Sequence, residues 1–112
     1  MTHIEIMAML DEMSLPYAYD HFAEGQSPQP PFLLFLCPSS RNFAADGRVY
    51  FKINEVHLEL YTDRKAPDTE LMLENVLDRY GVFYNKSEVW IESERLYEVL
   101  YSFETEDSAN GK

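Results

Sequence analysis

The chain has 112 residues, of which 46% are apolar and 14% aromatic, and its twenty Asp and Glu against nine Lys and Arg give a formal net charge of −11. This length fits one domain with a modest core. The negative charge disfavours general nucleic-acid binding, which needs clustered Lys and Arg, and disfavours an anionic membrane surface. A single cysteine, Cys37, excludes an internal disulfide, and no signal pattern is visible, so we expect a cytoplasmic setting.

The N-terminal segment Thr2–Met13 is predicted to be a helix. Thr2 and Glu5 have the spacing of a capping box, in which each side chain satisfies a free amide at the helix start. Residues at i, i+3, i+4 and i+7 form one apolar stripe, made of Ile6, Met9, Leu10 and Met13. The methionines are expected to fill the core, and an adaptable docking surface is the alternative.

Alternating and apolar runs then predict strands separated by loops. Tyr17–Phe22 alternates as a strand does, and Ala23–Pro31 is rich in Gly and Pro and is expected to be an exposed loop. Phe32–Cys37 is continuously apolar, which predicts a buried strand that Pro38 ends. Ser39–Gly47 is polar and is expected to be a loop.

The central stretch of the chain begins after Asp46-Gly47, a strong turn signal. In Glu55–Asp63 alternate apolar residues predict a central strand with one buried face, formed by Val56, Leu58 and Leu60. The apolar phase shifts at Asn54-Glu55, which either a tight turn or a β-bulge would explain. We favour the bulge, because this pair lacks the Gly that a two-residue hairpin usually needs.

A second helix and two closing strands complete the pattern. Pro67 suits the first helical position, Gly81 the end, and the stripe between them is Leu73, Val76, Leu77 and Tyr80. Val82–Ile91 and Arg95–Glu104 are predicted strands, the second with Tyr97, Val99, Tyr101 and Phe103 on one face. These elements predict a single α+β domain over residues 1–104, a mainly antiparallel sheet of four to five strands with two helices packed on one face, followed by a disordered polar tail over residues 105–112.

The residues give little sign of chemistry. Cys37, His57 and Asp20 have the side chains of a thiol catalytic set, but a cysteine that ends an apolar run is more often a buried, inert thiol. The histidines show no metal-ligand spacing, and no Cys-x-x-Cys pair or phosphate-binding Gly loop is present. We therefore predict no catalytic, cofactor-binding or metal-binding residues, and no enzyme.

The high aromatic content favours assembly of the chain into an oligomer. In strict alternation Trp90 faces away from Val89 and Ile91, so it is either an interface anchor or a cover for a sheet edge. A sheet that is aromatic on both faces has more apolar surface than two helices can cover, and an oligomer would cover the remainder.

Several segments resemble small structural proteins from the head-to-tail joining region of long-tailed bacteriophages and prophages, most closely the tail terminator, or tail-to-head joining, family. The segments extend over most of the chain: Leu15–Gly25 (LPYAYDHFAEG), Pro30-Pro31-Phe32, Leu58–Lys65 (LELYTDRK) and Ile91–Tyr101 (IESERLYEVLY).

The resemblance implies a non-enzymatic α/β protein that forms a hexameric ring with itself at the head-proximal end of the tail tube. Such a ring stops tube growth, contacts the tail tube protein and the head connector protein, and belongs to the virion tail after assembly in the bacterial cytoplasm. DNA would pass through it without specific binding, and an acidic channel wall suits that passage.

The outward side of the central strand becomes the candidate subunit interface or channel wall, with Glu55, His57, Glu59 and Tyr61, to which we add Trp90. Another head–tail connector or tail-completion protein, and a small cytoplasmic adaptor protein, remain the alternatives.

Overall fold

The computed structural model describes residues 1–45 and 48–108, with only the backbone for 42–45, 48–51 and 107–108. Its elements in chain order are α1 (His3–Glu12), β1 (Tyr17–Tyr19), β2 (Phe32–Ala45), β3 (Arg48–Thr62), α2 (Pro67–Arg79), β4 (Tyr84–Ile91) and β5 (Leu96–Ser108).

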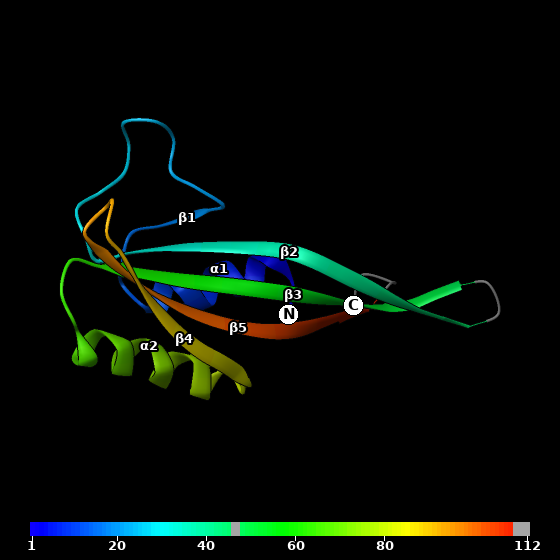
Figure 1. Ribbon diagram of the computed structural model, residues 1–112. Helices are drawn as coiled ribbons and strands as arrows, with labels where there is room; N and C mark the ends of the chain where they lie inside the picture. Colours follow the sequence, from blue (N-terminus) through cyan, green and yellow to red (C-terminus); the bar gives the residue numbers. More distant parts are fainter. Residues whose placement is uncertain (46–47, 109–112) are drawn as a thin grey trace.

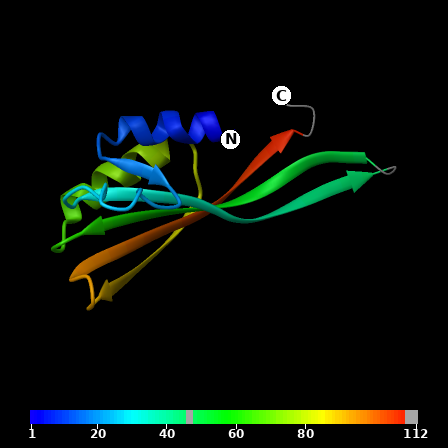
Figure 2. The same ribbon diagram turned by 90° about the horizontal axis from the view of Figure 1, so that it is seen from above.

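The five strands form one mixed sheet in the order β1-β2-β3-β5-β4, with β3 in the middle (Figure 1). β1 is parallel to β2, and the other neighbours are antiparallel. The predicted α+β class and the mainly antiparallel sheet are therefore confirmed. Both helices lie on the same side of the sheet (Figure 2).

The helices begin, end and pack largely as their sequences predict. Thr2 and Glu5 form the capping box of α1, and Pro67 opens α2. Gly81 follows α2 with a φ of 70°, the left-handed conformation that glycine adopts without strain. Of the two predicted stripes only Tyr80 is exposed, and Glu70 is buried on α2 instead.

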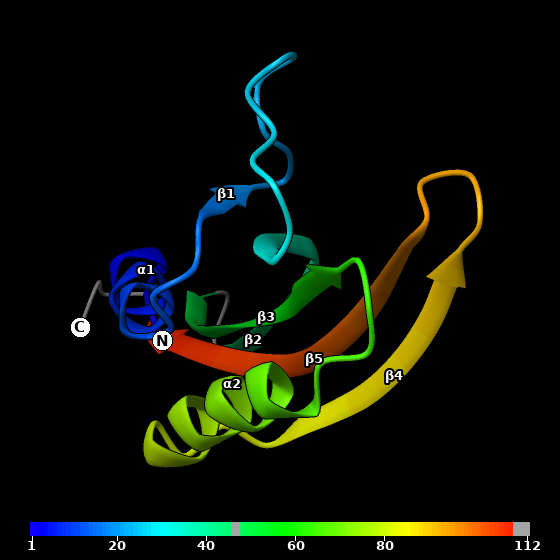
Figure 3. The same cartoon turned by 90° about the vertical axis from the view of Figure 1, so that its left-hand side faces the viewer.

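Buried side chains of the helices and the sheet form one core. Figure 3 shows the backbone of both helices beside the strands. The central strand contributes the three predicted residues, Val56, Leu58 and Leu60, all buried. The core also includes the stripe of each helix, Leu33 and Phe35 of β2, and Val99, Tyr101 and Phe103 of β5. Every second residue of the central strands thus faces the helices, which leaves the other face of the sheet without a helix.

The strand predicted over Tyr17–Phe22 is shorter than expected, because β1 ends at Tyr19. Asp20 has a φ of 67°, which turns the chain out of the sheet, although its amide still donates to the Phe35 carbonyl at 2.8 Å. Phe22 then packs edge-on against Phe32, with ring centroids 5.5 Å apart. The Ala23–Pro31 segment contains no helix or strand, as predicted.

The predicted end at Pro38 and the predicted loop after it are wrong. β2 continues through both to Ala45, and with β3 it forms a hairpin arm that projects from the body of the domain (Figure 1). We define this arm as residues 39–45 and 48–54. It gives the molecule a long axis of 51 Å against 30 and 22 Å for the other two.

A β-bulge was predicted in β3 at Asn54-Glu55, but the structure has it in β2. Leu36 pairs with His57 and Ser39 pairs with Glu55, so the extra residue belongs to β2, near Pro38. β3 itself passes Asn54 without interruption, so it is one strand and not two joined by a turn. A bulge is one of the few places in a sheet where the missing amide of proline is tolerated.

The prediction that a disordered tail begins at residue 105 is wrong. β5 continues to Ser108 and pairs with β3 as far as Phe51. Residues 109–112 lie outside the described residues, as does the predicted Asp46-Gly47 turn, although the flanking Ala45 and Arg48 pair with each other. No helix in the described part of the chain is long and apolar enough to cross a membrane.

Candidate functional site

Four of the five predicted interface residues lie together on the sheet face opposite the helices, which we call the open face. Glu55, His57, Glu59 and Tyr61 alternate with the buried residues of β3 and therefore share this side. The register adds Phe32, Leu34 and Leu36 from β2, and Glu98, Leu100 and Ser102 from β5. The open face thus combines leucine and aromatic side chains with carboxylates, an imidazole and a phenol.

Two glutamates, Glu59 and Glu98, lie close to Tyr61 at one end of the open face. The Tyr61 hydroxyl donates to Glu59 at 2.9 Å, and Tyr61 stacks on Phe32 with ring centroids 5.2 Å apart. Burial, together with the neighbouring Glu59 carboxylate, raises the pKa of Glu98. Burial and the hydrogen bond to Glu59 also raise the pKa of Tyr61. This end therefore holds two close carboxyl groups on a partly apolar surface, which opposes ionisation of Glu98.

A second polar group lies further along β3, toward the arm. His57 Nε2 is 2.9 Å from Glu55 Oε1, and the Ser39 hydroxyl donates to Glu55 Oε2 at 2.9 Å. These two hydrogen bonds lower the pKa of Glu55. The serine, the carboxylate and the imidazole do not form a nucleophile–base pair, because the hydroxyl is directed at the carboxylate.

Trp90 does not join the other four candidates. It pairs with Tyr97 on the side of the sheet that faces the helices, with ring centroids 4.7 Å apart, and its indole donates to Glu92. Lys65 lies over the Tyr97 ring at 5.4 Å. Trp90 remains 40% exposed near the end of β4. Any contact through Trp90 would therefore be separate from one through the open face.

The thiol catalytic set is not assembled. Cys37 packs against the core on the helix side, whereas His57 lies on the open face. Asp20 is hydrogen-bonded to its neighbour His21 at 2.9 Å. Among the described residues, no group of three or more His, Cys, Asp or Glu could hold a metal ion.

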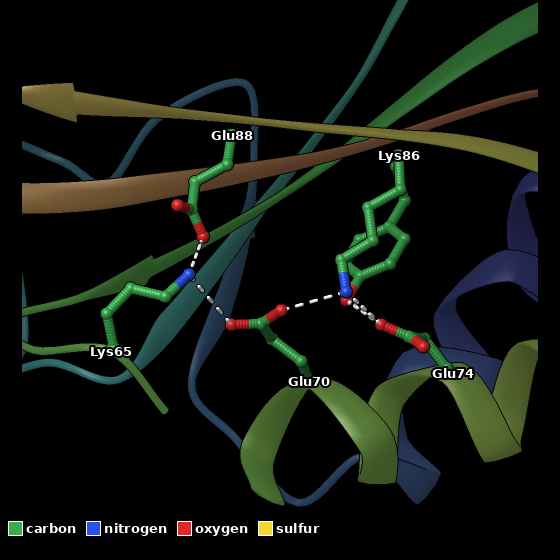
Figure 4. Close-up of polar contacts among 6 residues, drawn as sticks. Lys65, Glu70, Glu74, Lys86 and Glu88 are labelled. Atoms are coloured by element: carbon green, nitrogen blue, oxygen red, sulfur yellow. Dashed lines mark hydrogen bonds and ion pairs between the residues drawn. The ribbon is translucent and has the colours of Figure 1, made fainter. Parts of the chain in front are cut away.

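A charged network between α2 and the sheet was not predicted from the sequence (Figure 4). Lys86 of β4 contacts Glu70 at 2.8 Å and Glu74 at 2.7 Å, and Lys65 joins Glu70, at 3.8 Å, to Glu88. The buried Tyr101 hydroxyl donates to Glu74 at 2.8 Å. Burial raises the pKa of Glu74, but the hydrogen bonds from Lys86 and Tyr101 outweigh it and lower the pKa overall.

These ion pairs link α2 to β4. Glu70 is only 8% exposed, and Lys65 and Lys86 are its oppositely charged neighbours. A local pattern could not have revealed this network, because α2 and β4 meet only after folding.

A groove lies where β5 extends past Tyr84, the first residue of β4. It has a volume of about 630 Å³ and is lined by Tyr80–Phe83, by Ser102–Glu106 of β5 and by Met1, with Glu55 and Asn85 at its side. Phe83 is 96% exposed at the rim. Thr105 by contrast is only 7% exposed, and its hydroxyl has no hydrogen-bond partner among the described residues.

The exposed Phe83 and the unpartnered Thr105 mark this groove as a second candidate contact site. Neither stood out in the sequence, because Phe83 falls in a run predicted to be a strand and Thr105 in a run predicted to be disordered.

No protein-family model matches the chain, and no curated protein shows significant sequence similarity to it.

Proposed function

We propose that this chain is a non-enzymatic structural subunit of a long-tailed bacteriophage or prophage, a tail terminator that assembles into a hexameric ring at the head-proximal end of the tail tube. The ring stops tube growth and joins the tail to the head connector. The resemblance of four segments to that family, described above, supplies the phage assignment.

The open face is the observation that carries the assembly role. Two helices cover one side of the sheet, and the other side presents Leu34, Leu36 and Leu100 among hydrogen-bonding groups. A surface that combines apolar and polar groups in this way suits contact with protein, and the net charge of −11 suits a channel that DNA passes without binding. The projecting arm extends the reach of each subunit beyond its own core.

The test uses the chain together with the tail tube protein encoded in the same genome. We expect light scattering and electron microscopy to show rings, and we expect tubes polymerised with the chain present to be shorter and capped at one end. A phage that lacks the gene should accumulate overlong tubes and tailless heads.

Other outcomes separate the alternatives. Tails of normal length that fail to join heads would indicate a head–tail connector instead. A chain that stays monomeric with and without tube protein, and leaves tube length unchanged, would refute the ring and favour an adaptor.

A further inference from the structure

The arm and the end of β5 that pairs with it leave two free strand edges, one on each side of the sheet. β1 covers β2 only at Leu33–Phe35, so no described strand lies beside the outer edge of Ser39–Ala45. On the other side β4 covers β5 only as far as Phe103, so no strand in the described part of the chain lies beside the outer edge of Glu104–Ser108. Free strand edges present unpaired backbone groups and readily accept another strand.

One carbonyl on the outer edge of β5 already accepts a hydrogen bond from outside the sheet. The Met1 amino group donates to the Glu106 carbonyl at 3.2 Å. Backbone groups of an antiparallel strand point alternately to its two neighbours, so Glu104 shares the outward direction of Glu106. This edge runs along the groove that the exposed Phe83 and the unpartnered Thr105 line.

The charges of the two edges differ in sign. Ser39–Ala45 contains Arg41 and no acidic residue, whereas Glu104–Ser108 contains Glu104, Glu106 and Asp107 and no Lys or Arg. The two kinds of residue attract, since Arg41 reaches across β3 to Glu104 within one chain, at 3.0 Å. Two copies of the β5 edge would bring like charges together, so symmetric pairing of this edge is unfavourable.

We propose that the Ser39–Ala45 edge of one copy adds as a strand to the Glu104–Ser108 edge of a second copy and fills the groove beside it. Each subunit offers one edge of each kind, so the contact is head-to-tail, which closes into a ring when the rotation between copies allows it. β2 and β5 are both antiparallel to β3, so copies placed side by side in the same orientation pair these strands in parallel. The inference rests on the proposed ring and assigns its subunit contact.

Cross-linking tests the contact in a Cys37→Ser background, which removes the native thiol. One preparation carries Ser40→Cys and the other Glu106→Cys, and the two are mixed before assembly and treated with a short bismaleimide. We expect cross-linked dimers in the mixture and none in either preparation alone. Replacing Ser40→Cys with Glu94→Cys, in the distant β4–β5 turn, gives the matched control and should yield no dimer.

A proline variant tests the backbone part of the contact. Glu106→Pro removes an amide that points outward, so the pairing with β3 and the thermal unfolding temperature should be retained. Its self-association should weaken by about tenfold, as expected for one lost hydrogen bond. Glu106→Gln keeps the amide and controls for the lost charge.

The outcomes separate this inference from the proposed function. Rings that form without cross-links between positions 40 and 106, or with dimers from the Glu106→Cys preparation alone, would overturn the edge contact and leave the ring intact. A chain that stays monomeric even with tube protein would overturn both.

Discussion

Lys86→Met tests the charged network that joins α2 to β4. The substitution keeps much of the side-chain volume but removes the cation between Glu70 and Glu74. Among the described residues, Glu70 would then keep Lys65 at 3.8 Å, and Glu74 would keep the hydroxyl of Tyr101. Breaking a fully buried ion pair costs about 3–5 kcal/mol. The Lys86 side chain is 38% exposed, so we expect a loss of about 1–2 kcal/mol at pH 7.

Urea unfolding followed by circular dichroism measures this loss, and its pH dependence checks the cause. The pKa of Glu74 is lower in the folded chain than its usual 4.5, so its stabilising contribution is present above that pH and is lost as the pH falls through the folded-state value. The difference between wild type and variant should therefore shrink in acid.

The variant with Glu70→Gln, Glu74→Gln and Lys86→Met together removes all three charges and should be close to wild type in stability. A Lys86→Met variant as stable as wild type at pH 7 would refute the role of the network.

Three further predictions concern the core, the helix cap and the open face. Leu58→Ala should lower the free energy of unfolding by about 2–5 kcal/mol, measured by urea titration, because the side chain is fully buried; a loss below this range would mean that the site collapses around the smaller residue. Thr2→Ala should cost about 0.5–2 kcal/mol in the same assay by removing the capping box of α1, with Thr2→Ser as the conservative control. Glu59→Lys should leave the circular dichroism spectrum and unfolding midpoint near wild type but disturb ring assembly in light scattering. A variant that assembles normally would show that Glu59 takes no part in the subunit contact.

The helices and the buried faces of the strands could be predicted because their signals are local. A capping box, a helical stripe and a glycine stop lie within a few residues of one another, and the alternation in β3 marks its buried side directly. The four open-face candidates followed from that same alternation, although Glu98 joined them only through the register of β5.

The arm could not be predicted because the strand pairing that forms it leaves no signal in the local sequence. Ser39–Ala45 is polar and follows a proline, and both features normally indicate a loop. Thr105–Ser108 is similarly polar, and only the ladder with β3 makes it a strand. The phase shift near Asn54 did mark an irregularity, but the pattern of one strand does not show that the extra residue lies on its partner.

The position of β5 has a consequence for the time course of folding. It comes after every other described element in the sequence, yet it lies between β3 and β4 in the sheet. While the chain is being synthesised, the β2–β3 hairpin and both helices emerge before the strand that supplies Val99, Tyr101 and Phe103 to the core. The nascent chain therefore exposes the apolar side of β3 until β5 leaves the ribosome, which makes that interval the one in which chaperone binding or aggregation competes with folding.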